Sequence, residues 1–261
     1  MVLSMSRTAV QTENRNRRYA LIDSVRGITL LSMICYHGIW DLVYIYGLKW
    51  SWYKGSAAYI WQQSICWTFI FLSGFCWPLG KKPVKRGLMV LGGSVLVTAV
   101  TCLIMPESRV IFGVLSLIGS CMLLMIPLNK LLKKIPSEAG SFFSLLLFVL
   151  TRNINRGFLG FEAFNLIKLP GEWYRGMVAT YLGFTAPDFF STDYFSLFPW
   201  LFLFTGGYYL CHIFIKRNLF NISLFQWNFA PFSIPGRYSF WIYLLHQPVL
   251  MGIFQIVAFI K

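Results

Sequence analysis

The sequence predicts an all-α, polytopic integral membrane protein with about seven transmembrane helices. The 261-residue chain is 57% hydrophobic and only 12% charged, whereas soluble domains carry about 25% charged residues. The apolar residues also occur in long runs, and about 20 such residues cross the ~30 Å hydrocarbon core as a helix. A soluble protein of this size could not bury so much apolar surface.

Seven segments have the composition of membrane spans. The fifth is the weakest, because its apolar core runs only from Phe142 to Leu150. The stretch from Arg152 to Asp193 is aromatic and mixed, which indicates an external loop with interfacial or re-entrant pieces. We predict the spans at 20–46, 57–79, 87–105, 110–128, 138–152, 195–215 and 237–259.

The basic residues indicate an orientation. With the N-terminus inside, 15 of the 23 Lys and Arg residues fall in cytoplasmic segments, and each short inside loop has a basic cluster. Such clusters collect on the cytoplasmic side, where they meet anionic lipid. We therefore predict a cytoplasmic N-terminus, an external C-terminus and the plasma membrane of a bacterium. The net charge of +14 then indicates lipid and no nucleic acid.

One domain is the simplest organisation, since the chain has no internal repeat and no low-complexity linker. We divide it into a basic cytoplasmic tail, 1–18, and a transmembrane domain, 19–261. The tail lacks the short apolar core and cleavage site of a signal peptide, so we expect the first span to be retained. The six cysteines lie in apolar segments without a CxxC pair, which predicts neither disulfides nor a metal site.

The first span carries a stripe of ionisable residues, Asp23, Arg26, His37 and Asp41, which share one helix face at about 100° per residue. Such groups at membrane depth cost roughly 2.5–3.5 kcal/mol each and by default face protein or a water-filled cavity. His37 and Asp41 are four residues apart, so their side chains can meet. A carboxylate beside an imidazole suits a general base. A buried pair that only locks helix packing is the alternative.

The last span carries a second polar site, which consists of Gly236-Arg237-Tyr238-Ser239 followed by Tyr243, His246, Gln247 and Pro248. Ser239 and His246 are seven residues apart and share a face. Pro248 removes a backbone donor, which favours a kink beside a cavity. The alternative for His246 is a hydrogen bond to a neighbouring helix. His212, on the sixth span, is typical of an interfacial residue.

These residues resemble a known family. The segment from Arg18 to Gly27, followed by His37 and Asp41-Leu42, is similar to the heparan-α-glucosaminide N-acetyltransferase catalytic-domain family, part of a larger group of transmembrane acyltransferases. Acyltransferase-3 relatives carry an Arg, ten residues and a His on the first helix, which is the spacing of Arg26 and His37. Further matches are Phe71-Leu72-Ser73-Gly74-Phe75, Phe112-Gly113-Val114-Leu115, Ile118-Gly119, Phe198-Pro199-Trp200, Gly206-Gly207, Gly236-Arg237-Tyr238-Ser239 and Leu245-His246-Gln247-Pro248.

The resemblance implies a membrane-embedded O- or N-acyltransferase. It would move an acetyl or short acyl group from cytoplasmic acyl-CoA to a sugar or envelope-glycan acceptor at the external face. Acetyl-CoA is then a donor substrate, and no tightly bound cofactor is expected. The other expected partners are the lipid bilayer and a carbohydrate acceptor, and a homodimer is left open.

The implied roles follow the two polar sites. Catalytic roles fall to His37, which takes the acceptor proton, to Asp41, which orients it, and to His246. With Ser239, His246 would position the acyl group or donate to its oxyanion. The CoA phosphates would meet Arg26 and Arg237, and Asp23 belongs to the same site. Whether His37 is a base or forms an acyl-His intermediate stays open.

One departure bears on the acceptor. Animal members of the family have Asn where His37 stands and carry a His in the first external loop, whereas the loop from Gly47 to Ser56 has none. Heparan sulfate is therefore not the expected acceptor.

Two other functions fit a polar stripe in a membrane. A small-molecule or proton-coupled transporter also uses intramembrane charges, although the chain lacks the paired repeats with broken helices typical of one. A non-catalytic subunit could use the stripe to bind a partner helix.

Overall fold

The computed structural model describes residues 19–226 and 229–260, so the predicted tail, 1–18, lies outside the described residues. The described residues form nine α-helices and one two-stranded sheet. The prediction of a predominantly helical protein is confirmed, and the structure adds one small two-stranded sheet. The elements are α2 (Ala20–Tyr44), α3 (Ser56–Cys76), α4 (Pro83–Ile104), α5 (Val114–Leu132), α6 (Ser137–Thr151), β1 (Phe158–Phe161), β2 (Phe164–Lys168), α7 (Gly176–Leu182), α8 (Trp200–Lys216), α9 (Ala230–Arg237) and α10 (Ser239–Ile260).

By length and composition, three of the described helices can cross a membrane: α4, α5 and α10. Helix α2 has 25 residues but carries three charged side chains. Helices α6 and α8 have 15 and 17 residues, which rise about 22 and 26 Å and fall short of a ~30 Å core. The count of seven spans and the orientation of the termini stay predictions.

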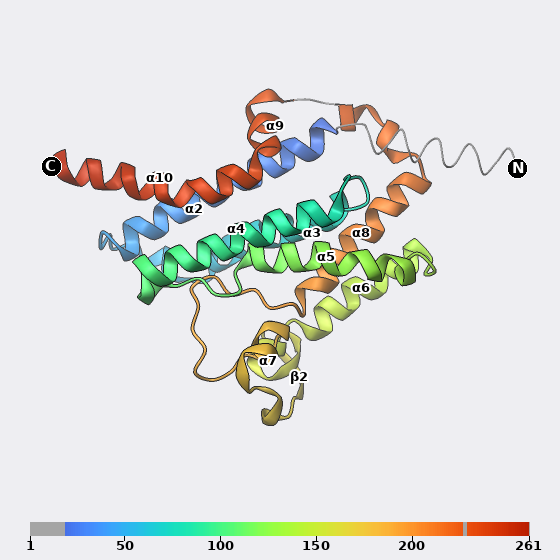
Figure 1. The fold of residues 1–261 in the computed structure, drawn as a ribbon, viewed down its shortest axis with the longest axis horizontal. Coiled ribbons are helices and arrows are strands. Elements are labelled where there is room, and N and C mark those ends of the chain that lie inside the picture. Colours follow the sequence, from blue (N-terminus) through green and yellow to red (C-terminus); the bar gives the residue numbers. More distant parts are fainter. Residues whose placement is uncertain (1–18, 227–228, 261) are drawn as a thin grey trace, which may run out of the picture. The chain divides into compact units, whose positions relative to one another are not determined.

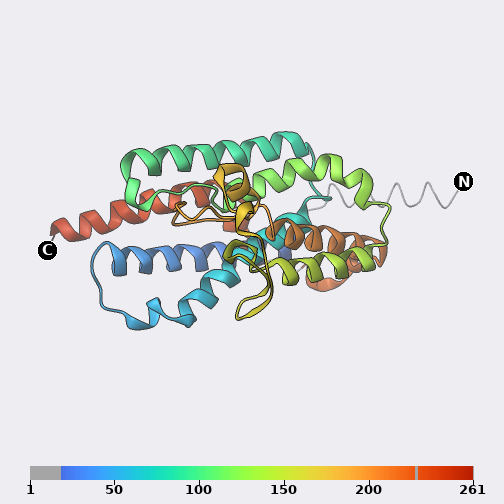
Figure 2. The same cartoon turned by 90° about the horizontal axis from the view of Figure 1, so that it is seen from below.

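The chain divides into two compact units, which we describe separately. The first comprises residues 70–219. Here α4 packs on α5 and α6 packs on α8, and both pairs lie side by side in Figure 2. The hydroxyl of Tyr208 on α8 donates to Asn129 Oδ1 on α5 at 2.7 Å. The hydroxyl of Tyr209 donates to the carbonyl of Leu132 at 3.1 Å.

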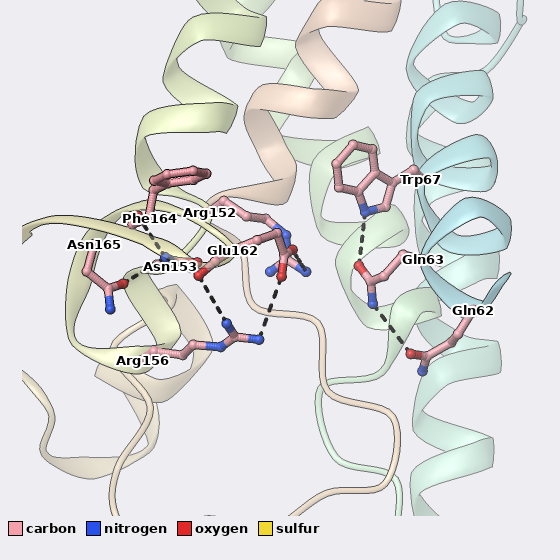
Figure 3. Close-up of polar contacts among 9 residues, drawn as sticks. All are labelled: Gln62, Gln63, Trp67, Arg152, Asn153, Arg156, Glu162, Phe164 and Asn165. Carbon is pink, nitrogen blue, oxygen red and sulfur yellow. Dashed lines mark hydrogen bonds and ion pairs between the residues drawn. The ribbon is translucent and has the colours of Figure 1, made fainter. Parts of the chain in front are cut away.

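A β-hairpin lies in the first unit, inside the segment expected to be an external loop with interfacial or re-entrant pieces. Strands β1 and β2 pair antiparallel, with Phe158 opposite Lys168 and an irregularity after Leu159. Figure 3 shows Asn153 pointing into this hairpin. Its amide donates to three acceptors, the carbonyls of Glu162 and Phe164 and Oδ1 of Asn165. The Glu162 carboxylate pairs with Arg152 at 3.1 Å and with Arg156 at 3.8 Å, so polar contacts hold the turn.

The second unit comprises residues 19–69 and the described part of 220–260. Helix α2 packs against both α9 and α10. Figure 1 shows α9 against the first turns of α2 and α10 along the rest of it. The predicted last span, 237–259, therefore corresponds to α10, and a separate short helix precedes it. Helices α9 and α10 are separated at Tyr238, whose backbone angles, φ −101° and ψ 16°, lie close to the bridge region.

Candidate functional site

Two arginines surround one carboxylate near the start of α2. Arg26 Nη1 lies 3.1 Å from Asp23 Oδ1, one helical turn away. Arg237, the last residue of α9, places its Nε 3.7 Å from Asp23 Oδ2. We call Arg26 and Arg237 the arginine pair. Two guanidinium groups around one carboxylate leave an excess positive charge, and both arginines are partly exposed. The structure thus joins three of the predicted donor-site residues.

A close crossing of α2 and α9 positions this charge cluster. Gly27 and Gly236 face one another, because a Cβ on Gly27 would overlap the backbone carbonyl of Phe232 and a Cβ on Gly236 would overlap that of Asp23. Small residues let two helix backbones approach this closely. The approach brings Arg237 within ion-pair distance of Asp23, and any side chain at either glycine would push the helices apart.

Further along α2, two imidazoles meet across the contact with α10. The ring centroids of His37 and His246 are 5.0 Å apart at an interplanar angle of 56°. Gly38 beside them allows α10 to approach, with Leu250 Cδ2 3.7 Å from the position a Cβ would take. Two predicted catalytic residues, from helices separated by most of the chain, are therefore brought together.

The hydrogen bond of His246 selects its tautomer. Nδ1 of His246 contacts the backbone carbonyl of Tyr243. A carbonyl oxygen can only accept, so Nδ1 carries the hydrogen. In the neutral imidazole, Nε2 then holds a free lone pair. Neutral His246 is thus suited to accept a proton at Nε2, and only its protonated form could donate to an oxyanion.

Asp41 is completely buried, with a relative exposure of 0%. Its Oδ1 accepts a hydrogen bond from Gln247 Nε2 at 2.7 Å, which ties α2 to α10 one residue from His246. The hydrogen bonds of the described residues include none between Asp41 and His37. In place of the predicted hydrogen bond with His37, Asp41 accepts one from Gln247, a residue of the second polar site that had no role assigned to it.

Three buried polar atoms at this contact have no hydrogen-bond partner among the described residues: Asp41 Oδ2, His246 Nε2 and Gln247 Oε1. Buried polar groups are hydrogen-bonded in the great majority of proteins, and leaving one unpaired costs free energy. With Asp41 ionised and His246 neutral, all three atoms are acceptors. Together they suit a ligand that presents several O–H or N–H donors, and we call them the acceptor set.

The remaining predicted residues lie elsewhere. Ser239 is the first residue of α10 and half-buried, about 10 Å along the helix axis from His246. His212 belongs to the other unit, where its ring lies 4.5 Å from that of Tyr208. Groups of three or more metal-ligating side chains do not occur in the described part of the chain.

The polar residues of α3 were not predicted to be part of a site. Figure 3 shows Trp67 Nε1 donating to Gln63 Oε1 at 3.0 Å, and Gln63 Nε2 reaching Gln62 Oε1 at 3.4 Å. The sequence feature that could have identified these residues is the pair of adjacent amides, Gln62 and Gln63, within the otherwise apolar predicted span 57–79. Through these contacts, side chains of α3 provide hydrogen-bond partners for one another.

The helices and the polar contacts within them define an integral membrane protein with an ionisable site among its helices. Residues 18–248 match the family described as heparan-alpha-glucosaminide N-acetyltransferase, catalytic. The chain belongs to this family, which confirms the resemblance and implies acetyltransferase activity. No curated protein and no solved structure matches the chain.

Proposed function

We propose that the protein transfers an acetyl or short acyl group from cytoplasmic acyl-CoA to a sugar or envelope-glycan acceptor at the external face. The observation that carries this proposal is the pairing of His37 and His246 beside the acceptor set. Histidine is the side chain that most often serves as a general base in enzymes. The unpaired buried acceptors suit a hydroxyl-rich or amino substrate, which supports a sugar.

The arginine pair is the proposed site for the phosphates of CoA. Guanidinium groups bind phosphate with charge-assisted, often bidentate hydrogen bonds. Asp23 would hold both side chains in place, and the net charge of the cluster would stay positive. The basic residues that precede this end of α2 in the sequence favour the cytoplasmic side for it by the positive-inside rule.

The two imidazoles work as one unit in this mechanism. Two positive charges about 5 Å apart repel by about 3 kcal/mol at an effective dielectric constant of about 20, so at most one ring is protonated. His246 Nε2, or His37 next to it, takes the proton from the acceptor hydroxyl or amine. The acceptor atom bonds to the thioester carbonyl carbon, the carbon–sulfur bond then breaks, and the proton passes to the CoA thiolate.

Asp41 and Ser239 have supporting roles in this proposal. The Asp41 carboxylate lies in the same buried region and favours the protonated imidazole electrostatically. It is held by Gln247 rather than by His37. Ser239 lies too far along α10 for contact with His246 and is assigned to the donor side, near Arg237.

The test uses the full-length protein in lipid nanodiscs with acetyl-CoA and amino-sugar acceptors. We expect acetyl-CoA-dependent acetylation, and a fall in kcat of about 100-fold or more for His37→Ala and for His246→Ala, the usual size of general acid–base effects. His212→Ala is the matched control and should keep full activity. Thermal unfolding must show that the variants remain folded.

Two results would contradict the proposal. Full activity of folded His37→Ala and His246→Ala proteins would exclude the imidazole pair. Substrate flux in proteoliposomes without any dependence on CoA would instead support the transporter.

A further inference from the structure

Aromatic residues gather in the loop after α2 and at the start of α3. Trp50, Trp52 and Trp61 form a stack: Trp50 and Trp52 have ring centroids 6.2 Å apart at 28°, and Trp52 and Trp61 6.4 Å apart at 23°. We call these three residues the tryptophan stack. Trp50 and Trp52 are 38% and 47% exposed. Trp50 and Trp52 therefore present aromatic surface, and Trp61 joins them to the hydrophobic core, against which it packs.

Hydrogen bonds and packing fix this stack in place. Trp61 Nε1 donates to Ser32 Oγ at 2.7 Å. Tyr53, which follows Trp52, is 4% exposed, and its hydroxyl donates to the backbone carbonyl of Tyr36 at 2.8 Å. The loop is thus pinned to α2, and a preorganised surface loses little entropy when a ligand binds.

The stack is one side chain away from the imidazole pair. The ring of Tyr36 lies 5.3 Å from Trp61 and 5.7 Å from His37. Both contacts are within the same compact unit. A ligand on the stack would therefore lie near the end of α2 that carries His37, away from the arginine pair.

The loop that carries Trp50 and Trp52 has basic residues and no acidic ones. Lys54 Nζ lies 5.9 Å from the ring centroid of Tyr44, which is itself 52% exposed. Lys49 lies in the same loop, and no Asp or Glu occurs in the sequence between Asp41 and Glu107. An anionic ligand would meet two ammonium groups here and no carboxylate from this stretch of the chain.

We propose that the tryptophan stack and Lys54 bind the acceptor, as a subsite for a sugar ring that carries an anionic group. This inference rests on the proposed function, because it assigns the acceptor of the same site. The face of a sugar ring is lined by C–H groups, which pack on the electron-rich face of an aromatic ring. Lys54 would bind the anionic substituent beside that ring. The sugar's free hydroxyl or amine then reaches the acceptor set.

Binding is measured first, by tryptophan fluorescence of the full-length protein in nanodiscs. The probe is an amino-sugar disaccharide with one carboxylate, and its neutral counterpart is the comparison. We expect saturable quenching by the charged probe, weakened about tenfold or more by Trp52→Ala, as for a central aromatic contact. Trp52→Phe should recover part of the affinity. Lys54→Ala should remove the preference for the charged probe, whereas Lys54→Arg should keep it.

The matched control is Trp173→Ala, which removes another tryptophan that is 50% exposed, in the other unit. It should leave binding of the probe unchanged. In turnover assays, Trp52→Ala should raise KM for the acceptor while KM for acetyl-CoA stays the same.

Three outcomes would overturn the subsite. The first is that the charged probe does not quench the tryptophan fluorescence of the wild type or of Trp173→Ala. The second is that Trp52→Ala binds the probe with the same affinity as the wild type. The third is a Trp52→Ala protein that changes only in its stability in bilayers, which identifies an aromatic belt in the lipid headgroups. Because quenching needs no turnover, failure of the subsite is distinguishable from failure of the acyltransferase proposal, which is decided by acetyl-CoA-dependent activity.

Discussion

The crossing of α2 and α9 gives the sharpest test of how the fold makes the donor site. In Gly27→Ala, the added methyl group would overlap the backbone carbonyl of Phe232. Backbone atoms cannot rotate out of the way as a side chain can. Helix α9 must therefore move away from α2 by more than about 1 Å to restore ordinary van der Waals distances, and Arg237 moves with it.

The size of the effect follows from two opposing terms. Ala is about 1 kcal/mol better than Gly inside a helix, but overpacking a close contact costs about 1–3 kcal/mol. We expect net destabilisation. The 3.7 Å contact of Arg237 with Asp23 would lengthen beyond ion-pair distance. Loss of one half-exposed charge contact is worth about 1 kcal/mol, so KM for acetyl-CoA should rise about fivefold.

Gly252→Ala is the matched control, because this glycine lies in α10 with no neighbouring atom within 4 Å of the position a Cβ would take. It should be as stable as wild type or slightly more so. Thermal unfolding and acetyl-CoA saturation curves of both variants decide the matter. Gly27→Ala with the stability and KM of Gly252→Ala would refute the claim that this crossing positions Arg237.

Two further predictions concern single polar contacts. Gln247→Leu leaves the buried Asp41 carboxylate without its 2.7 Å donor, which should cost about 1–3 kcal/mol of stability and shift the pH profile of kcat/KM. Gln247→Asn keeps an amide and should lose less stability. Equal pH profiles for the wild type and both variants would exclude a positioning role for Gln247. Burial raises the pKa of Asp193, which accepts a hydrogen bond from Val114, to about 6. Because the folded state then binds the proton more tightly, wild type should lose up to about 3 kcal/mol relative to Asp193→Asn as pH rises from about 4 to 6; parallel pH–stability curves for the two proteins would contradict this.

Helical periodicity was enough to predict which residues share a face, but not which of them touch. The stripe on α2 and the site on the last span were both visible in the sequence, and His37 does meet His246. Asp41 was expected to contact His37 because they are four residues apart. Instead its Oδ1 accepts a hydrogen bond from Gln247, which the approach of α10 brings within 2.7 Å. Such a choice depends on how two distant helices cross, which one sequence does not encode locally.

Short elements escaped prediction for a related reason. Helix α9 has eight residues and an internal proline, Pro235, so neither propensity nor periodicity marks it. It forms because it packs closely on α2 through Gly236. The hairpin after α6 likewise depends on one side chain, Asn153, whose three hydrogen bonds close the turn. Tertiary contacts of this kind override weak local preferences.

The length of the CoA arm can be compared with the distance along α2 between Arg26 and His37. Arg26 and His37 are eleven residues apart, a rise of about 16 Å along the helix. The arm of CoA between its pyrophosphate and its sulfur has roughly a dozen bonds, and three chain bonds span at most about 3.6 Å. The extended arm therefore reaches roughly 14 Å. With phosphates on the arginine pair, the thioester carbonyl would arrive close to the imidazole pair only if the arm runs nearly straight along α2. This match gives the spacing of Arg26 and His37 on α2 a physical reason under the proposed acyl transfer.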